Sequence, residues 1–274
     1  IMNKLLREER RSRILQELQN HGQVTATELS KTFNVSEITI RRDLRELANE
    51  GSLRRIYGGA VTVHPEQTEP PVVQRMSQNE EYKKMIGRAA AELVHDGDSV
   101  FIGSGSTTTY VARNLVGKEN VTVVTNALNI GMELAMMEEI TVIIIGGMMR
   151  PSELSMVGHI AEVALQEVRL DKIILGIPAI HFEKGLTNDY LPEVMTDRTL
   201  LGMTNEVILV ADHTKFDKVC SAYLAPITAV TSLVTDYLTE KKYLDQIKDL
   251  GISVVVADNE LSVVQSQSMP GEQA

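Results

Sequence analysis

The apolar residues of this chain follow two different patterns along its length. Up to about residue 63 they recur every three or four positions, which is typical of amphipathic helices. The pattern predicts helices at 7–20 and 25–33, and a third that begins after Ser36 and ends at Gly51. Three short helices in succession therefore open the chain.

The predicted helix starts carry capping residues. Thr25 or Thr27 can cap the second helix, and Glu28 stands three residues after Thr25, as in a capping box. Ser36 precedes the third helix and follows a tight turn at Asn34-Val35. A short second helix, a tight turn and a capped third helix together favour a helix-turn-helix.

The third helix has a face rich in arginine. Turned at about 100° per residue, it places Ile40, Leu44 and Leu47 on one side, which must face a core. The other side and its flanks carry Ile38, Thr39, Arg41, Arg42 and Arg45. In the major groove an arginine can bond guanine bidentately and an isoleucine can touch a thymine methyl group. This face is therefore predicted to bind DNA, and the candidate contacts also include Thr25, Ser36 and Glu37 at the helix starts.

A hairpin is predicted after the third helix. Residues 53–63, LRRIYGGAVTV, contain two short β-prone runs around Gly58-Gly59, which predicts a two-residue turn. Arg54 and Arg55 on the first strand are expected to hold backbone phosphate. Residues 1–63 therefore read as a winged helix-turn-helix domain. The alternative is a solvated, charged helix in an ordinary helical bundle, which the combination of turn, cap and wing disfavours.

Charge is distributed unevenly along the chain. The formal net charge is −10, yet residues 1–63 hold 11 Lys and Arg against 8 Asp and Glu, and the remainder holds 16 against 29. A basic head on an acidic body indicates a module that meets phosphate, joined to one that does not. Double-stranded DNA is the predicted partner of the head.

The second pattern begins after a segment rich in proline and polar residues. HPEQTEPPVVQR at 64–75 is interpreted as part of a linker over 64–81. Apolar runs of strand length then alternate with helical stretches, at 99–103, 121–125, 141–147, 172–177, 206–212, 229–236 and 252–258. This alternation predicts an α/β domain over 82–260, with a mostly parallel sheet covered on both faces. The polar tail, 261–274, is predicted to be disordered.

Ligands on such sheets bind at the carboxyl ends of the strands. The turn GSGSTTTY leaves a strand and opens a helix, where backbone N–H groups and the helix dipole favour an anion. It supplies Gly103, Ser104, Gly105, Ser106, Thr107 and Thr108 as candidate ligand contacts, and other strand ends add Thr125, Asn126, Gly147, Gly176, Asp212 and the following Lys215. Taken alone, the turn is equally compatible with a plain strand-to-helix connection, and Lys215 with a surface lysine.

The residues together resemble a known family. Arg10, Ile14 and Leu18, followed by SEITIRRDL, resemble the helix-turn-helix signature of the DeoR family of bacterial transcriptional regulators, and GSLRRIYGGAV resembles its wing. GSGSTT, GGMMRPSELSMVG and ADHTKF are similar to segments of the family's effector domain. The resemblance implies a repressor of a carbohydrate-metabolism operon whose C-terminal domain senses a phosphorylated sugar. It also implies a fold similar to ribose-5-phosphate isomerase and coenzyme A transferases, and a homodimer or homotetramer.

Two segments depart from the family pattern. A glycine-then-aspartate run is common after the fourth strand, whereas this chain has GIPAI, with Pro178 and Ala179. Many members carry a lysine next to the arginine in the segment that begins at Glu193, whereas here Asp197 precedes Arg198. Both departures lie near the expected rim of the pocket and suggest an altered ligand.

Two other functions stay open at this point. A sugar-phosphate isomerase needs a base and a group that polarises a carbonyl, for which Asp189, Glu193 and Asp212 are candidate carboxylates. The DGADE-like catalytic run of the related isomerase is absent from the sequence. A third possibility is a binding module that oligomerises and takes no effector.

No cofactor or metal is expected. The six histidines and Cys220 show no metal-ligand spacing, and a single cysteine allows no intramolecular disulfide. No apolar run approaches the roughly 18 residues that span a bilayer, and the first residues lack the apolar core of a secretory signal. These features predict a cytoplasmic protein without a membrane partner.

Overall fold

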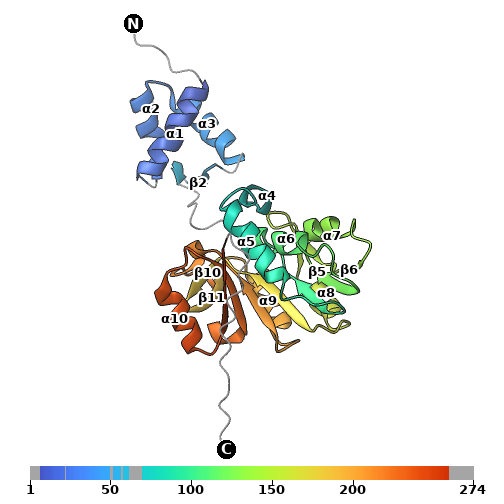
Figure 1. Ribbon diagram of the computed structural model, residues 1–274. Coiled ribbons are helices and arrows are strands. Elements are labelled where there is room, and N and C mark those ends of the chain that lie inside the picture. Colours follow the sequence, from blue (N-terminus) through green and yellow to red (C-terminus); the bar gives the residue numbers. More distant parts are fainter. Residues whose placement is uncertain (1–6, 22, 50–51, 57, 62–69, 259–274) are drawn as a thin grey trace, which may run out of the picture. The chain divides into compact units, whose positions relative to one another are not determined.

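The computed structural model describes residues 7–21, 23–49, 52–56, 58–61 and 70–258. The chain divides into two units, residues 1–69 and residues 70–274 (Figure 1). The tail predicted over 261–274 and the first part of the predicted linker, 64–69, lie outside the described residues.

The first unit is the predicted winged helix-turn-helix. Its elements are α1 (Arg7–His21), β1 (Gln23–Thr25), α2 (Ala26–Phe33), α3 (Glu37–Asn49), β2 (Arg54–Ile56) and β3 (Gly59–Val61). Ile14, Phe33 and Leu44 meet in one buried core, to which all three helices contribute. The three predicted helices are confirmed, because the apolar positions that suggested them are the ones that the core buries.

The wing contains one strand more than predicted. β3 pairs antiparallel with both β1 and β2, in the order β1-β3-β2. Gly58 has a φ of 82°, a backbone conformation that favours glycine. The prediction that Gly59 also belongs to the turn was wrong, because Gly59 begins β3. A Cβ atom there would lie 2.1 Å from the carbonyl oxygen of Val24, so the close approach of β1 requires glycine.

A buried ion pair joins α1 to α3. Nε of Arg10 donates to Oδ2 of Asp43 over 2.6 Å, and a terminal nitrogen donates to Oδ1 over 3.2 Å. Asp43 is fully buried and Arg10 nearly so. Because a buried charge is costly without its partner, this pair favours one rotation of α3 about its axis.

The second unit is built on a seven-stranded sheet in the order β15-β14-β12-β9-β4-β5-β6, in which every pair of neighbours is parallel. The strands are β4 (Ser99–Ile102), β5 (Val121–Thr125), β6 (Ile140–Ile144), β9 (Lys172–Gly176), β12 (Val207–Val210), β14 (Ser232–Asp236) and β15 (Ser253–Ala257). Each strand coincides with a predicted apolar run, so the parallel α/β fold is confirmed.

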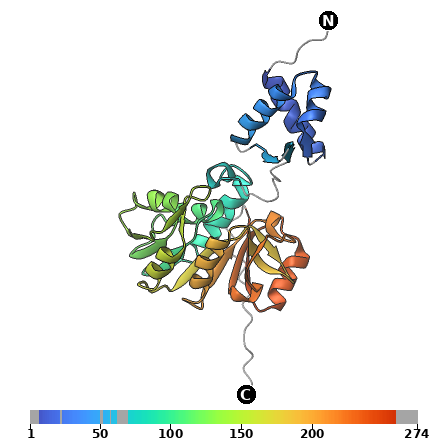
Figure 2. The ribbon, with the colours of Figure 1, turned by 180° about the vertical axis from the view of Figure 1, so that it is seen from behind.

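Helices cover both faces of this sheet (Figures 1 and 2). They are α5 (Glu80–Ala91), α6 (Ser106–Arg113), α7 (Leu128–Leu134), α8 (His159–Leu165), α9 (Leu191–Leu201) and α10 (Lys241–Asp249). Val100 packs in a core with α5, α6 and α7, whereas its neighbour Phe101 packs in a second core with α8, α9 and α10. Burial on both faces explains why the strands are apolar throughout rather than alternating.

Two small antiparallel sheets were not predicted. β7 (Met148–Arg150) and β8 (Ser155–Val157) form a hairpin, and β10 (Ala179–His181), β11 (Gly185–Asn188) and β13 (Ala222–Ala225) form a three-stranded sheet. Short 3-10 helices, η1 (His213–Lys215) and η2 (Ile227–Ala229), complete the unit. Most of these strands have only three or four residues and include a polar one, so they show no continuous apolar run.

The predicted linker, 64–81, was too long. Residues 70–81 belong to the second unit, where α4 (Val72–Arg75) packs and α5 begins. The backbone N–H of Val72 donates to the carbonyl oxygen of Ser152 over 2.7 Å, and the Val72 side chain is buried. Arg75 is also buried and forms an ion pair with Glu153. This segment is rich in proline and polar residues, so its sequence resembles a linker. The residues that it packs against lie about 80 positions further along the chain and are not evident from the local sequence.

Candidate nucleic-acid interface and effector site

The exposed face of α3 has the predicted composition. Ile40, Leu44 and Leu47 are buried, whereas Ile38 is 79 % exposed. The arginines at 41, 42 and 45 are exposed. An apolar side chain and three cations thus share the solvent side of one helix, and their role in binding DNA remains a prediction.

Thr25 and Ser36 cap the two helices. The Thr25 hydroxyl accepts from the backbone N–H of Glu28 over 3.2 Å, and the Glu28 carboxylate accepts in return from the Thr25 N–H, which completes the predicted capping box. Ser36 Oγ accepts from the N–H of Thr39 over 3.3 Å and lies 2.9 Å from the Thr39 hydroxyl. Both serve first to set the start of a helix, which leaves DNA contact as a second, untested role.

Glu37 connects α2 to the arginine face of α3. It accepts from the Thr27 hydroxyl over 2.8 Å and from Arg41 over 3.1 Å. The hydrogen bond from Thr27, followed by that from Arg41, lowers the pKa of Glu37 below its ordinary value. Glu37 therefore stays ionised and orients Arg41 across the first turn of α3.

The remaining arginines differ in their ion pairs. Nε of Arg42 lies 4.0 Å from Oε1 of Glu46, whose other oxygen pairs with Arg7. Within the described residues, no carboxylate lies within ion-pair distance of Arg45. Arg42 and Arg45 are thus weakly held or free, and each can turn toward an external acceptor.

The wing lies beside the arginine face. Arg55 is exposed, and it lines, together with Arg41 and Gly58, a small cavity of about 20 Å³ between α3 and the hairpin. Arg54 stands at the start of β2. The fold therefore brings the cation of Arg55 to the side of the helix that carries Arg41.

The candidate ligand contacts of the second unit gather at one edge of the sheet. β5, β4, β9 and β12 are consecutive neighbours, and their carboxyl ends lead into the predicted residues Thr125, Asn126, Gly103, Gly176 and Asp212. Parallel strands have their carboxyl ends on the same side, so these residues lie along one rim. Gly147, between β6 and β7, follows the next strand in the sheet.

The turn after β4 presents the first turn of α6. Gly105 has a φ of 141°, which side chains rarely permit, and directly precedes the helix. The hydroxyl of Thr108 donates to the carbonyl oxygen of Gly105 over 3.0 Å, so this donor is used within the turn. Ser106 and Thr107 are buried, and no hydrogen bond of their hydroxyls is formed within the described residues. The first N–H groups of a helix also lack partners within it.

Thr125 and Asn126 have different roles at the end of β5. The Thr125 hydroxyl donates to the carbonyl oxygen of Ile102 over 2.7 Å and accepts from the Ala127 N–H, which fastens β5 to β4. Nδ2 of Asn126 donates to the carbonyl oxygen of Met156 over 3.1 Å. Oδ1 of Asn126 is buried and has no hydrogen-bond partner among the described residues, which leaves an acceptor available at the rim.

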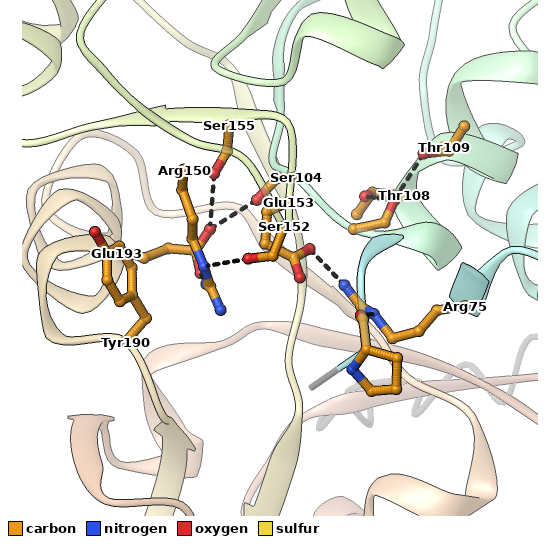
Figure 3. A network of polar contacts seen from close by, with 12 residues as sticks. Arg75, Ser104, Thr108, Thr109, Arg150, Ser152, Glu153, Ser155, Tyr190 and Glu193 are labelled. Atoms are coloured by element: carbon orange, nitrogen blue, oxygen red, sulfur yellow. Dashed lines mark hydrogen bonds and ion pairs between the residues drawn. The ribbon is translucent and has the colours of Figure 1, made fainter. Parts of the chain in front are cut away.

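A network centred on Glu193 occupies the middle of the rim (Figure 3). Oε1 of Glu193 accepts from Ser104 over 2.9 Å and from Ser155 over 3.3 Å, and Oε2 accepts from Nδ2 of Asn188 over 3.2 Å. The guanidinium of Arg150 completes the set with an ion pair to Oε2. Glu193 is only 5 % exposed, so these four donors replace its hydration.

Further groups surround this network. The guanidinium carbon of Arg150 lies 4.5 Å from the centre of the Tyr190 ring, and Nε donates to Ser152 Oγ over 3.2 Å. Asp197 lies one helical turn after Glu193 on α9 and is buried. Burial, and then the negative charge of Glu193, raise the pKa of Asp197 well above its ordinary value, although Arg150 opposes the shift.

Asp212 acts as a local cap in the structure. Its Oδ1 accepts from the N–H and the hydroxyl of Thr214, at the start of η1. Lys215 is the last residue of this short helix, so the loop after β12 sets the positions of both predicted residues. For both residues, contact with a ligand stays a prediction.

Sequence reasoning missed four members of the Glu193 network: Arg150, Ser155, Asn188 and Tyr190. Arg150, Ser155 and Asn188 come from β7, β8 and the end of β11, short strands that were not predicted, and Tyr190 directly precedes α9. Arg150 and Ser155 nevertheless stand inside GGMMRPSELSMVG, a segment that the sequence had marked as distinctive. That segment was the available signal for the arginine.

A winged helix-turn-helix joined to a parallel α/β domain defines the class of this protein, a DNA-binding regulator with a separate sensor domain. Residues 10–66 match the DeoR-like helix-turn-helix domain, and residues 78–237 match the DeoR C terminal sensor domain. The chain belongs to the DeoR family of transcriptional regulators.

Several relatives named as regulators align with this chain over almost their entire length. The glycerol-3-phosphate regulon repressor of Escherichia coli (strain K12) is 33 % identical over 228 residues, which cover 83 % of this chain and 90 % of the relative. The HTH-type transcriptional regulator IolR of Bacillus subtilis (strain 168) is 32 % identical over 238 residues, which cover 87 % and 94 %. The transcriptional repressor AccR of Agrobacterium fabrum is 32 % identical, over 84 % and 89 %.

These relatives decide between the regulator and the isomerase. They are named as regulators or repressors, so this chain is a DNA-binding regulator and not an enzyme. Ribose 5-phosphate isomerase A from Neisseria gonorrhoeae, a solved structure, has a TM-score of 0.39 at 19 % identity over 51 % of this chain and 55 % of its own, a likeness too low to bear on activity. In the described part of the chain, no helix is both long and apolar enough to cross a membrane.

Proposed function

We propose that this protein is a repressor of a carbohydrate-metabolism operon, and that a phosphorylated sugar bound in the second unit changes its affinity for operator DNA. The observation that carries the effector part is the turn at 103–108, where the start of α6 and two uncommitted hydroxyls lie on the rim of the sheet. Anions bind well at such helix starts. The relative named for the glycerol-3-phosphate regulon supports a small phosphorylated ligand.

The DNA part of the proposal rests on α3 and the wing. Ile38, Arg42 and Arg45 face solvent on the second helix of a helix-turn-helix, the element that enters the major groove. Arg54 and Arg55 of the wing are proposed to hold backbone phosphates, and thereby to position α3 without reading sequence. Such domains bind paired half-sites, so we also propose a homodimer or homotetramer in the cytoplasm.

The effector part is tested by thermal unfolding with a panel of sugar phosphates and the matching free sugars, beginning with glycerol 3-phosphate and glycerol. A ligand at about 100 times its dissociation constant stabilises the folded state by roughly 2.7 kcal/mol, which gives a measurable rise in Tm. We expect a phosphorylated compound to raise Tm and its free sugar to leave it unchanged.

A pair of serine variants locates the binding site of any compound that raises Tm. Ser106→Ala removes a buried hydroxyl of the turn, and Ser253→Ala removes an exposed one at the start of β15, at the opposite edge of the sheet. Ser106→Ala should reduce the rise in Tm and Ser253→Ala should not. Equal responses of the two variants would place the ligand elsewhere.

A further inference from the structure

The carboxylate of Glu193 is an anion held inside the proposed effector site. It lies on α9, and its two oxygens accept from Ser104 and Ser155 and pair with Arg150 (Figure 3). Nδ2 of Asn188 donates to the same carboxylate. These partners come from three different segments: the turn after β4, the β7–β8 hairpin and the end of β11. Glu193 therefore connects segments that are distant in sequence but adjacent along the rim of the sheet.

Two of its partners are groups that an anionic ligand needs. Ser104 belongs to the turn that leads into α6, and its hydroxyl donates to Glu193 rather than to the open rim. The guanidinium of Arg150 is a planar set of donors suited to carboxylate or phosphate, and it too is engaged by Glu193. A ligand anion that reaches Ser104 and Arg150 therefore meets a carboxylate that already holds these two donors.

Like charges close together in a partly dehydrated site repel strongly. A phosphate beside Ser104 and the Glu193 carboxylate cannot both use the same hydroxyl and guanidinium without that repulsion. The interaction favours one anion over two, so either the ligand or Glu193 takes these donors.

We propose that Glu193 is an internal competitor of the effector: the effector's anionic group takes over Ser104 and Arg150, and the Glu193 carboxylate leaves them. The inference rests on the proposed function, because it assumes that an anionic effector binds at the turn. It adds that the affinity for this anion is lowered by a residue of the protein itself, and that binding moves α9.

The displacement of Glu193 has a route to the rest of the unit. Arg198 lies on the same helix, and its guanidinium donates to the backbone carbonyl oxygens of Tyr223 and Leu224, the latter over 3.2 Å. Both carbonyls belong to β13, in the three-stranded sheet. A shift of α9 on effector binding would therefore be transmitted to β13 through these hydrogen bonds.

The test uses inorganic phosphate as the probe and the full chain, with affinity measured by isothermal titration at constant ionic strength. Glu193→Gln keeps the size and an acceptor oxygen of the side chain but removes its charge. We expect this variant to bind phosphate about tenfold more tightly than the unaltered protein, equivalent to about 1.4 kcal/mol. The control is Glu139→Gln, an exposed glutamate at the amino-terminal side of β6, which should not change the affinity.

A second variant loosens Glu193 without touching the turn. Ser155→Ala removes one of the four donors to the carboxylate, and this serine is not part of the turn at 103–108. It should tighten phosphate binding in the same direction, by about two- to fivefold. A merely structural role for the network predicts the opposite, since loss of a buried contact would loosen the site. Should Glu193→Gln fail to fold, Ser155→Ala decides the question.

The outcomes separate this inference from the proposed function. Phosphate binding by the unaltered protein, without a gain in either variant, overturns the internal competitor and leaves an anionic effector in place. No phosphate binding by the unaltered protein or by either variant overturns both the internal competitor and an anion site at this turn. Binding that becomes measurable only in Glu193→Gln or Ser155→Ala supports both.

Discussion

Ile38 and Ile40 stand two positions apart on α3, yet the first is 79 % exposed and the second is fully buried. Exposure of a large apolar side chain among cations has a use at a DNA surface, where a thymine methyl group offers an apolar contact. At the scale of single residues, helical periodicity was enough to predict this contrast. It was also enough to place Arg42 and Arg45 on the solvent side.

Arg42→Ala tests whether this face reads DNA. Loss of an arginine that contacts a base should weaken operator binding by about 1–3 kcal/mol and relax the preference at one position of the site. Binding is measured by fluorescence anisotropy on the operator and on single-base variants of it.

The matched control is Arg13→Ala, which removes another exposed arginine from α1, where it pairs with Glu9. Arg13→Ala should change operator affinity little. Equal effects of the two variants would mean that α3 contributes charge but no specific contact.

Asp197 gives a prediction about pH. Its pKa is raised in the folded protein, so its contribution to stability is complete below its unfolded pKa, near 4, and is lost as the pH rises through the folded pKa. Asp197→Asn removes this loss. The variant should therefore unfold at a higher urea concentration than the unaltered protein at neutral pH, by a margin that shrinks toward pH 4.

The comparison variant is Asp245→Asn, at an exposed position of α10. This variant removes a carboxylate that solvent already surrounds, so it should change the midpoint of urea unfolding at neutral pH little. A constant difference for Asp197→Asn between pH 4 and pH 8 would contradict a raised pKa at this residue.

At the scale of elements, the orientation of α3 depends on more than its apolar stripe. Three apolar positions bring one side of the helix to the core, and the buried pair of Arg10 and Asp43 favours a single rotation. An aspartate within an arginine-rich helix normally reads as solvated, since aspartate is seldom buried. The approach of Arg10 on α1 shows that Asp43 is instead buried and paired.

Asp43→Ala should therefore destabilise the first unit by about 3–5 kcal/mol, because Arg10 remains as a buried charge without its carboxylate. Hydrogen exchange of the α3 backbone amides in the full chain measures the effect as faster exchange. Replacing both partners, Arg10→Met with Asp43→Leu, should restore most of the protection.

Glu9→Ala serves as the control for this series, because it breaks an ion pair whose partners are both about half exposed. Pairs of that kind contribute at most about 1 kcal/mol. Slow exchange of α3 in Asp43→Ala would show that the apolar core alone orients the helix.

At the scale of the whole molecule, the proposal joins two sites on separate units. If the effector changes operator affinity by some factor, operator DNA must change effector affinity by the same factor, since the two are linked through one free energy. Titrations of the effector with and without operator, and of the operator with and without effector, measure both factors. Equality is the expected result, with a factor of about 5–150.

A compound that raises Tm but leaves operator affinity unchanged would contradict this coupling. It would favour instead a binding module that takes no regulatory effector. The control ligand in these titrations is the free sugar that matches the active sugar phosphate, and it should not change operator affinity.

The sequence by itself determined the two units, the winged helix-turn-helix, the parallel sheet and the solvent face of α3. These follow from local periodicity, capping residues and turn residues. Each of these signals involves only a few neighbouring positions, so it can be recognised in the sequence. The turn at 103–108 was predicted for the same reason, because a strand, a glycine and the start of a helix follow one another directly in the sequence.

Only the tertiary structure decided which donors at the rim are free. Thr108 and Thr125 are used by nearby carbonyls, while Ser104 turns to a glutamate 89 positions away. It also decided that Arg75 belongs to the second unit and that Asp43 is buried. Each of these depends on a partner distant in sequence, and a buried charge or hydroxyl reveals its role only when the fold brings that partner within hydrogen-bond distance.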